Sequence, residues 1–258
     1  MKKNLIILFL LLLIVSASAE SAEGLFSANE ELVYEVSFMG ISIGEVKLAA
    51  IGAETLKGRE AYHVRATLKT HNNIPFLKAN IVYDSWIDKS LKFSHKLEAR
   101  IIHDSGNKEL FITDMSYPEI MFRKSINNKT TEEKSIKVGG RICEGLTLIY
   151  IIRQMAGSGK SIIIPTIQGY DTSATKLTFE KAKNLINIDA FDYKTPSFYI
   201  AGKGNWTGVY GVTGDFRAWV SADNMRVPLK AQVKLYLGMV NIELKKWKRK
   251  SWKPLDSN

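Results

Sequence analysis

The stretch YHVRATLK, residues 62–69, alternates strictly between apolar and polar side chains. Successive side chains of a β-strand point to opposite faces, so a period of two predicts a strand with one buried face and one solvated face. The stretch LKAQVKLYL, residues 229–237, repeats the pattern near the other end of the chain. Together they predict an antiparallel sheet with one face toward water.

The same period continues outward from these stretches, although less regularly. Turn residues such as Lys57-Gly58 and Asn127-Asn128 separate the segments. Many short strands at this spacing predict a mainly β fold, a large antiparallel, strongly curved sheet that forms a half-barrel or a sandwich. Whether the sheet closes is left open. The further strand candidates are 32–39, 45–51, 93–102, 110–115, 176–179, 185–190 and 215–220.

One segment, residues 145–156 (GLTLIYIIRQMA), breaks this rhythm because it is apolar on almost every side. It ends at Gly157-Ser158-Gly159, which suits the end of a helix. We expect one substantial apolar helix here, largely buried, with a strand as the alternative because of its β-branched isoleucines. Such a helix on the concave face of a curved sheet would create pockets.

The amino-terminal residues have the pattern of an export signal. Two lysines at 2 and 3 precede an apolar run over 5–15 and the small residues Ala17-Ser18-Ala19. The run is shorter than the roughly 20 residues of a spanning helix. We expect a signal peptide over 1–19, cleaved after Ala19, and a periplasmic mature protein without a transmembrane span. The mature chain is predicted to hold a single β-rich domain over 20–244 and a basic, tryptophan-containing tail over 245–258.

The single cysteine and the charge limit the classes of protein. Cys143 is the only cysteine, so neither an internal disulfide nor a lipid anchor at the cleavage site is expected. The formal net charge is +10, which favours anionic partners such as phospholipid or lipopolysaccharide. Export argues against nucleic acid as a partner, and an envelope protein partner is left open.

No catalytic or metal-binding constellation is present in the sequence. The four histidines lack metal-ligand spacing, and we interpret His63 and His71 as surface residues. The adjacent acids Glu30 and Glu31 would point to opposite faces of a strand and are interpreted as solvated charge. No catalytic residue, no metal and no cofactor are therefore expected.

Three residues are candidates for ligand binding. The glycine-rich stretch 202–214 could present Trp206 and Tyr210 to a sugar or lipid, although glycine beside aromatic residues also serves packing alone. Arg226 could contact an anionic ligand, or could pair with Asp223 or Asp215 instead.

The basic tail offers a second candidate surface. Cations with interleaved tryptophans are attracted to an anionic membrane or to lipopolysaccharide. A solvated tail after the last strand is the alternative. The residues concerned are Lys245, Lys246, Trp247, Lys248, Arg249, Lys250 and Trp252.

Three stretches carry a resemblance to a known family: ELVYEVSFMGISIGEV (31–46), YDSWID (83–88) and AWVSADNMRVPLKAQVKL (218–235). They resemble the exported bacterial family known as domain of unknown function 3108. The most specific positions are Gly40, Gly44, Asp223, Arg226 and Pro228. The resemblance implies an envelope β protein whose activity is not established, and it provides no catalytic residues.

Elementary chemistry gives several of these positions structural roles. Gly40 and Gly44 are expected to bracket a tight reversal over 41–43, and Pro228 is expected at a strand start.

These observations favour a non-catalytic binding module for an apolar or amphiphilic envelope ligand. The alternative is a structural or assembly factor that docks on envelope components through its basic tail or a sheet edge. An enzyme acting on wall or glycan substrates is left open. It would need two carboxylates about 5 to 10 Å apart, and the sequence identifies no such pair.

Overall fold

The structure is a computed structural model that describes residues 24–74, 78–206, 212–235 and 238–256. The predicted signal peptide lies outside these ranges. The described residues form fourteen strands and one helix. The first eight strands are β1 (Glu31–Phe38), β2 (Ile41–Leu56), β3 (Arg59–Thr70), β4 (Asn80–Asp88), β5 (Ser94–Ile102), β6 (Lys108–Ser116), β7 (Glu119–Ile126) and β8 (Lys129–Lys137). The helix α1 (Gly145–Met155) is followed by β9 (Ser161–Gln168), β10 (Asp171–Ile186), β11 (Thr195–Gly204), β12 (Val212–Ser221), β13 (Pro228–Leu235) and β14 (Gly238–Lys248).

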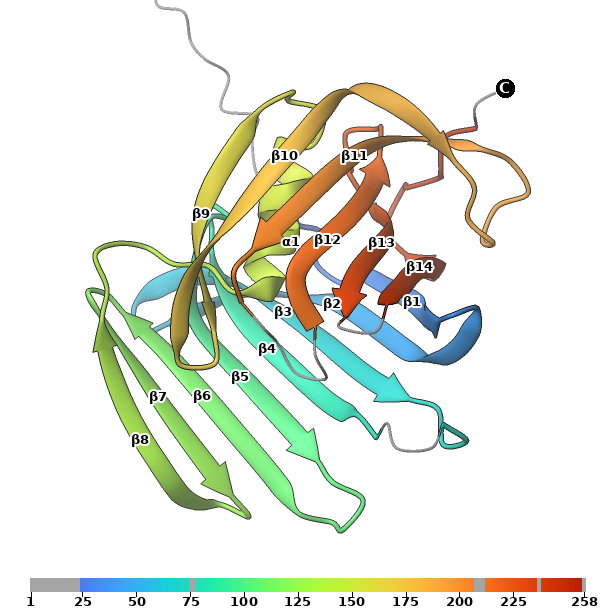
Figure 1. The fold of residues 1–258 in the computed structure, drawn as a ribbon. Helices are drawn as coiled ribbons and strands as arrows, with labels where there is room; N and C mark the ends of the chain where they lie inside the picture. The colour runs from blue at the N-terminus through green and yellow to red at the C-terminus, as the bar shows by residue number, and fades with distance from the viewer. Residues whose placement is uncertain (1–23, 75–77, 207–211, 236–237, 257–258) are drawn as a thin grey trace, which may run out of the picture.

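All fourteen strands belong to one antiparallel sheet, in the order β8 to β1 followed by β14 to β9. Every hydrogen-bonded pair joins strands that are neighbours in the sequence, except the pair of β1 with β14. Figure 1 shows the sheet curling so that β9 to β12 pass over α1, on the far side from β3 and β4. The predicted fold class, a large curved antiparallel sheet with one apolar helix, is confirmed.

The helix begins and ends where the sequence indicates. Glu144 is the N-cap, and its carboxylate accepts hydrogen bonds from the backbone nitrogens of Leu146 (2.7 Å) and Thr147 (2.9 Å). After Ala156 the chain turns at Gly157, whose φ is 78°. Leu148 and Ile152 lie one turn apart on the same side of α1, and their side chains are buried among residues of β10, β11 and β12.

The two edges of the sheet are protected differently. β8 has charged or hydroxylated side chains at nearly every position, which discourages pairing with another chain. Part of β9 is covered by Cys143, whose backbone nitrogen donates to the Pro165 carbonyl (3.0 Å) and whose carbonyl accepts from Ile167 (3.0 Å). The Cys143 thiol is buried, and this burial raises its pKa.

Six strands fall outside the segments that the period of two predicts, and one predicted boundary is wrong. These strands are β4, β7, β8, β9, β11 and β14. β8 is polar on both faces, whereas β9 begins with a continuous apolar run. The predicted start of the tail at residue 245 falls inside β14, which continues to Lys248 because it pairs with β1 up to Glu31.

The two motif glycines have different roles from those predicted. The reversal between β1 and β2 lies at Met39–Gly40, where both residues have positive φ (51° and 80°), so the prediction of a turn over 41–43 is wrong. Gly44 lies within β2, between Val36 of β1 and Thr70 of β3. A Cβ at Gly44 would lie 2.5 Å from the Lys69 carbonyl oxygen. Close approach of two backbones therefore requires glycine there.

This close approach predicts the effect of a methyl group at Gly44. Gly44→Ala should lower the free energy of unfolding by about 1 to 3 kcal/mol, since the obstacle is backbone. Gly52→Ala is the matched control, because Gly52 lies in the same strand with nothing within 4 Å of the new Cβ. Urea unfolding measures both; equal stability of the two variants would contradict this assignment.

Candidate functional site

A cavity of about 400 Å³ lies between the amino-terminal end of α1, the inner face of β4 to β7, and the turn between β9 and β10. Its walls are mostly aliphatic and aromatic. They include Leu97, Ala99, Ile101, Phe111, Phe122, Leu146, Ile149 and Ile167. The strand residues among them alternate with solvated neighbours, which is why they share one face. The lining also includes the polar residues Glu144 and Tyr170.

The Glu144 carboxylate is buried and fully engaged in the structure. Besides the two backbone nitrogens of α1, it accepts hydrogen bonds from three hydroxyl groups. These are Ser85 Oγ at 2.9 Å, Ser94 Oγ at 2.8 Å and Thr147 Oγ1 at 2.6 Å. Glu144 therefore fastens the start of α1 to β4 and β5, and its lone pairs are occupied by this task.

Tyr170 and nearby charges form a polar border beside the apolar walls. The Tyr170 hydroxyl donates to Glu132 Oε2 at 2.9 Å, and Lys134 Nζ lies 4.4 Å from the centre of the Tyr170 ring. Burial, and then the Glu132 carboxylate, raise the pKa of Tyr170, so it stays a neutral donor. Lys124 Nζ lies 4.9 Å from the centre of the Phe111 ring. The cavity thus combines an apolar interior with a charged border.

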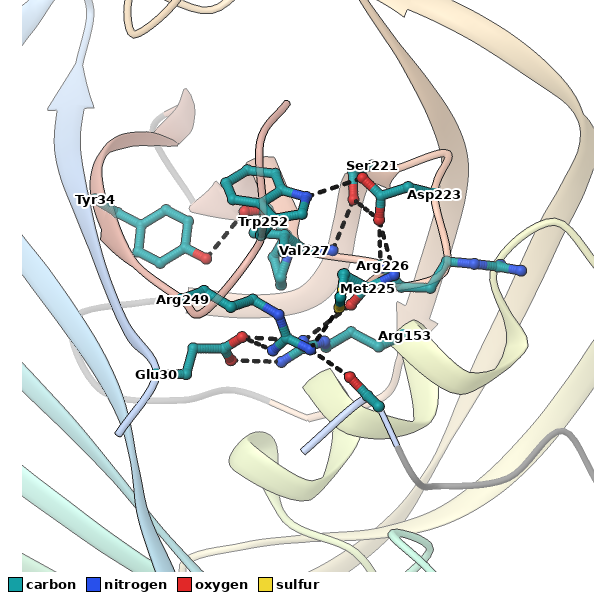
Figure 2. A network of polar contacts seen from close by, with 12 residues as sticks. Glu30, Tyr34, Arg153, Ser221, Asp223, Met225, Arg226, Val227, Arg249 and Trp252 are labelled. Atoms are coloured by element: carbon teal, nitrogen blue, oxygen red, sulfur yellow. Dashed lines mark hydrogen bonds and ion pairs between the residues drawn. The ribbon is translucent and has the colours of Figure 1, made fainter. Parts of the chain in front are cut away.

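A second cluster joins three distant parts of the chain (Figure 2). Glu30 is 3% exposed and lies between the guanidinium groups of Arg153 and Arg249, which are also buried. Arg153 Nη1 and Nη2 lie 2.8 and 3.3 Å from the two Glu30 oxygens, and Arg249 Nη1 bonds to Glu30 Oε2. Burial lowers the pKa of both arginines, and that of Arg249 is lowered to about 10, so Arg249 stays charged at neutral pH.

The Asp223 carboxylate organises the turn beside this cluster. Asp223 Oδ1 accepts from the Met225 backbone nitrogen at 2.8 Å and from Ser221 Oγ at 3.0 Å. Asp223 Oδ2 accepts from Trp252 Nε1 at 2.9 Å, and Tyr34 donates to the Pro228 carbonyl at 3.0 Å. The family motif around Asp223 therefore fixes the β12–β13 turn against the chain ends (Figure 2). Pro228 begins β13, as predicted.

Two of the three predicted ligand-binding residues, Trp206 and Arg226, are not among the residues that line the cavity. The Arg226 side chain bonds to the Ala156 carbonyl at the end of α1 and lies 4.9 Å from the centre of the Phe198 ring. Its backbone nitrogen donates to Asp223 Oδ1 at 3.1 Å. Trp206 donates from Nε1 to Thr175 Oγ1 at 3.1 Å, and Tyr210 lies outside the described residues. A ligand-binding role for these residues stays a prediction.

The predicted anionic-surface residues divide into two groups. Lys245 to Lys248 belong to β14, and Lys245 is paired with Asp189 at 3.0 Å. Arg249 and Trp252 are buried, so their side chains are not available to an outside surface. The Trp252 ring also packs edge-on against Trp247 at 5.4 Å between centres. Lys246, Lys248 and Lys250 are exposed, and their contact with an anionic surface stays a prediction.

A third polar cluster lies on the outer face of β3 to β5. Asp84 is 1% exposed and accepts from His63 Nε2 (2.6 Å), Arg65 Nε (2.7 Å) and Arg100. His63 Nδ1 also lies 2.7 Å from Glu54 Oε1. Burial acts to raise the Asp84 pKa, but these hydrogen bonds and the arginine charges outweigh it and lower the pKa to about 2. The interpretation of His63 as a surface residue is wrong, because it is buried between two carboxylates.

The polar residues with the most hydrogen bonds and ion pairs are not revealed by the sequence pattern. Glu30 was interpreted as solvated charge, whereas its carboxylate is enclosed by two arginines. The signal that could have revealed the cluster is Arg153, a single cation inside an otherwise apolar helix. A buried guanidinium needs an anionic partner, and Glu30 and Glu144 are the two buried glutamates among the described residues.

The sequence from residue 33 to residue 245 matches the model of the family described as "Protein of unknown function (DUF3108)". The chain belongs to this family. No curated protein matches the sequence. Among the residues with described positions, no helix has the length and apolar character needed to cross a bilayer.

Two solved structures match the chain. One is a β-barrel-like protein of domain of unknown function DUF1849 from Brucella abortus, with a TM-score of 0.57 and 10% identity, over 85% of this chain and 96% of that one. This likeness supports the fold alone. The other is a candidate exported protein with a YmcC-like fold from Bacteroides fragilis, with a TM-score of 0.35 and 8% identity, over 86% and 97% of the two chains.

The Glu30 cluster predicts a large effect for an isosteric change. Glu30→Gln should lower the free energy of unfolding by about 3 to 5 kcal/mol, because it leaves two buried guanidiniums without an anion. The neighbouring Glu31→Gln is the control, since Glu31 pairs with Lys47 at a half-exposed site and should cost less than about 1 kcal/mol. Urea unfolding of both variants tests this, and equal losses would refute the assignment.

The Asp84 cluster predicts a pH dependence. Its pKa is about 2 in the folded chain against an ordinary value of 3.8, so its stabilisation is complete above pH 3.8 and is lost as the pH falls toward 2. In Asp84→Asn the free energy of unfolding should fall by about 1 to 2 kcal/mol less between pH 5 and pH 2 than in the unmodified protein. Asp104 lies at an exposed turn and provides the control: in Asp104→Asn the free energy of unfolding should fall between pH 5 and pH 2 as much as in the unmodified protein. An equal fall in Asp84→Asn and Asp104→Asn would contradict the prediction.

Proposed function

We propose that this protein is an exported, periplasmic, non-catalytic binding protein whose cavity holds an apolar or amphiphilic ligand of the cell envelope. The observation that carries the proposal is the cavity of about 400 Å³ with apolar walls. A contiguous apolar surface that is left uncovered by the fold is typical of an interaction or ligand site. Its volume falls within the range of about 300 to 1,000 Å³ typical of ligand sites.

The polar border supports an amphiphilic ligand over a wholly apolar one. A chain packed among Leu97, Phe111 and Ile149 would leave its polar end near Tyr170 and Lys134. The Tyr170 O–H is donated to Glu132, so the donor at this border is the Lys134 ammonium, whose three N–H groups suit phosphate, carboxylate or ester oxygens.

The occupied state of Glu144 supports binding without catalysis. It is the one carboxylate among the cavity-lining residues, and five donors already share its oxygens. A general base needs a free lone pair directed at its substrate. A pair of carboxylates flanking a bond, as glycoside hydrolysis requires, is not found among the described lining residues.

Export and a periplasmic location belong to the same proposal. They are supported by the lysines, apolar run and small-residue site of residues 1–19. Fractionation of cells expressing the natural chain, with the amino-terminal residue read by mass spectrometry, tests this part separately.

An assembly factor that docks through a sheet edge is the second candidate. β9 favours it, because Ile163 on this edge strand is 70% exposed. Docking through the carboxy-terminal tail is less favoured, since Arg249 and Trp252 are used in the fold.

Filling the cavity should abolish binding without unfolding the chain. Ala99→Phe puts an aromatic ring into the space among Leu97, Ile101 and Phe111, and should weaken binding of an apolar naphthylamine fluorophore by at least about tenfold. Ala53→Phe makes the same change at an exposed position of β2 and should bind like the unmodified protein. Fluorescence titration is the measurement, with thermal unfolding to verify the fold.

Native mass spectrometry of the protein purified from envelopes complements the titration. An amphiphile that accompanies the unmodified chain and Ala53→Phe, but not Ala99→Phe, would support the proposal. Equal fluorophore affinity in all three proteins would overturn it.

A further inference from the structure

The hairpin between β1 and β2 ends in large apolar side chains directed at solvent. Met39 is 80% exposed and Ile41 is 63% exposed, on either side of Gly40. Neither belongs to a buried cluster of the described residues. Exposure of two large apolar side chains that flank a turn gives the fold no stabilisation.

Two other hairpins of the same chain show what such a turn needs. Lys57–Gly58 and Asn127–Asn128 also have positive φ at both turn residues, as in the tight turns that match strand twist. Their side chains are polar, and asparagine or glycine is favoured in this conformation. At Met39 (φ 51°) the turn geometry gives no reason for methionine. A contact outside the chain would give that reason.

Basic residues lie beside the apolar tip, at the same end of the sheet. Lys69 lies at the end of β3, opposite Glu45 of β2, Lys78 precedes β4, and the His71 ring lies 3.1 Å from Ser42 Oγ, one residue after Ile41. Lys69 and Lys78 line a hollow of about 320 Å³ together with His103 and the half-exposed Ile102. Asp104 is the only acid in its described lining.

The size and chemistry of this end favour a lipid surface over a protein. A stable protein interface buries roughly 800 Å² on each partner around a packed apolar centre. Two tip residues flanked by lysines instead match interfacial insertion, in which apolar side chains enter the acyl boundary and cations meet anionic head groups.

We propose that the β1–β2 tip docks this protein on an anionic phospholipid bilayer, with Met39 and Ile41 inserted and Lys69 and Lys78 on the head groups. Strand register places the β9–β10 turn, which lines the cavity, at the same end of the sheet. Exchange of a ligand between bilayer and cavity would follow from this placement. That second step rests on the proposed function, whereas docking does not.

Vesicle co-sedimentation of the mature chain tests docking. Vesicles containing phosphatidylglycerol should bind the protein more tightly than vesicles of phosphatidylcholine alone. The double variant Met39→Asn, Ile41→Thr keeps residues that suit the turn and the strand, and should weaken binding by about tenfold or more, as expected for two partly buried apolar side chains. Lys69→Gln with Lys78→Gln should weaken binding to the phosphatidylglycerol vesicles only.

Ile163→Thr provides the matched control, because it removes an equally exposed apolar side chain from β9 and should leave vesicle binding unchanged. Absence of binding by the unmodified protein, or equal losses in the tip and Ile163 variants, would overturn the docking proposal. Fluorophore titration separates the two proposals: the tip variant should still fill its cavity. Docking without cavity binding would remove only the proposed function and the exchange step.

Discussion

The carboxylate of Glu30, held between the guanidiniums of Arg153 and Arg249, is the interaction on which the architecture depends. Among the described strands, β1 and β14 are the one pair that joins distant parts of the sequence. The entropic cost of closing a long loop therefore falls on this pairing. Glu30 immediately precedes β1, and Arg249 immediately follows β14. Arg153 lies in α1, so one carboxylate connects the segment before β1, the segment after β14 and the helix. The attraction within a buried ion cluster adds little net stability, because desolvation of the charges offsets it. Removal of the anion lowers stability strongly, because it leaves buried positive charges without a partner.

The cavity follows from the way α1 is held. Glu144 fastens its first turn to Ser85 and Ser94, while Arg153 and the Arg226 contact with Ala156 fasten its last. Between these polar anchors the helix packs on β10 to β12, which belong to the carboxy-terminal half of the sheet. The inner face of β5 to β7 is left with apolar side chains that the first turn of α1 only partly covers. Directional hydrogen bonds, rather than packing on every side, position the helix, and this arrangement leaves part of the apolar sheet face uncovered.

The sequence predicts those parts of the fold in which local pattern and tertiary environment agree. β3 and β13 can be predicted from the sequence because their apolar and polar side chains alternate. The helix α1 can be predicted because its apolar run ends at glycine. β8 and β9 are not, since an edge strand with charges on both faces and a strand with a continuous apolar run both lack the period of two. The burial of Glu30 and Trp252 cannot be predicted from their sequence neighbours. Arg153 and Arg249, which enclose Glu30, are more than a hundred residues away, and Trp252 bonds to Asp223 in the β12–β13 turn. The cavity draws its walls from strands, helix and turn, so no single stretch of sequence encodes it.

The antiparallel topology also places the polar clusters that stabilise the fold and the surfaces proposed for binding at opposite ends of the sheet. Consecutive connections alternate between the two ends of the sheet, so the segment before β1, the β12–β13 turn and the segment after β14 all meet at one end. The Glu30 and Asp223 clusters are built there (Figure 2). The opposite end carries the Met39 hairpin and the β9–β10 turn that borders the cavity. Polar interactions at the first end hold the chain, and this leaves the second end able to carry exposed apolar side chains that add nothing to folding. Exposed apolar side chains also occur elsewhere among the described residues, as at Ile163 and Leu185, but Met39 and Ile41 flank a single turn at the cavity end, and this pairing favours a contact surface there.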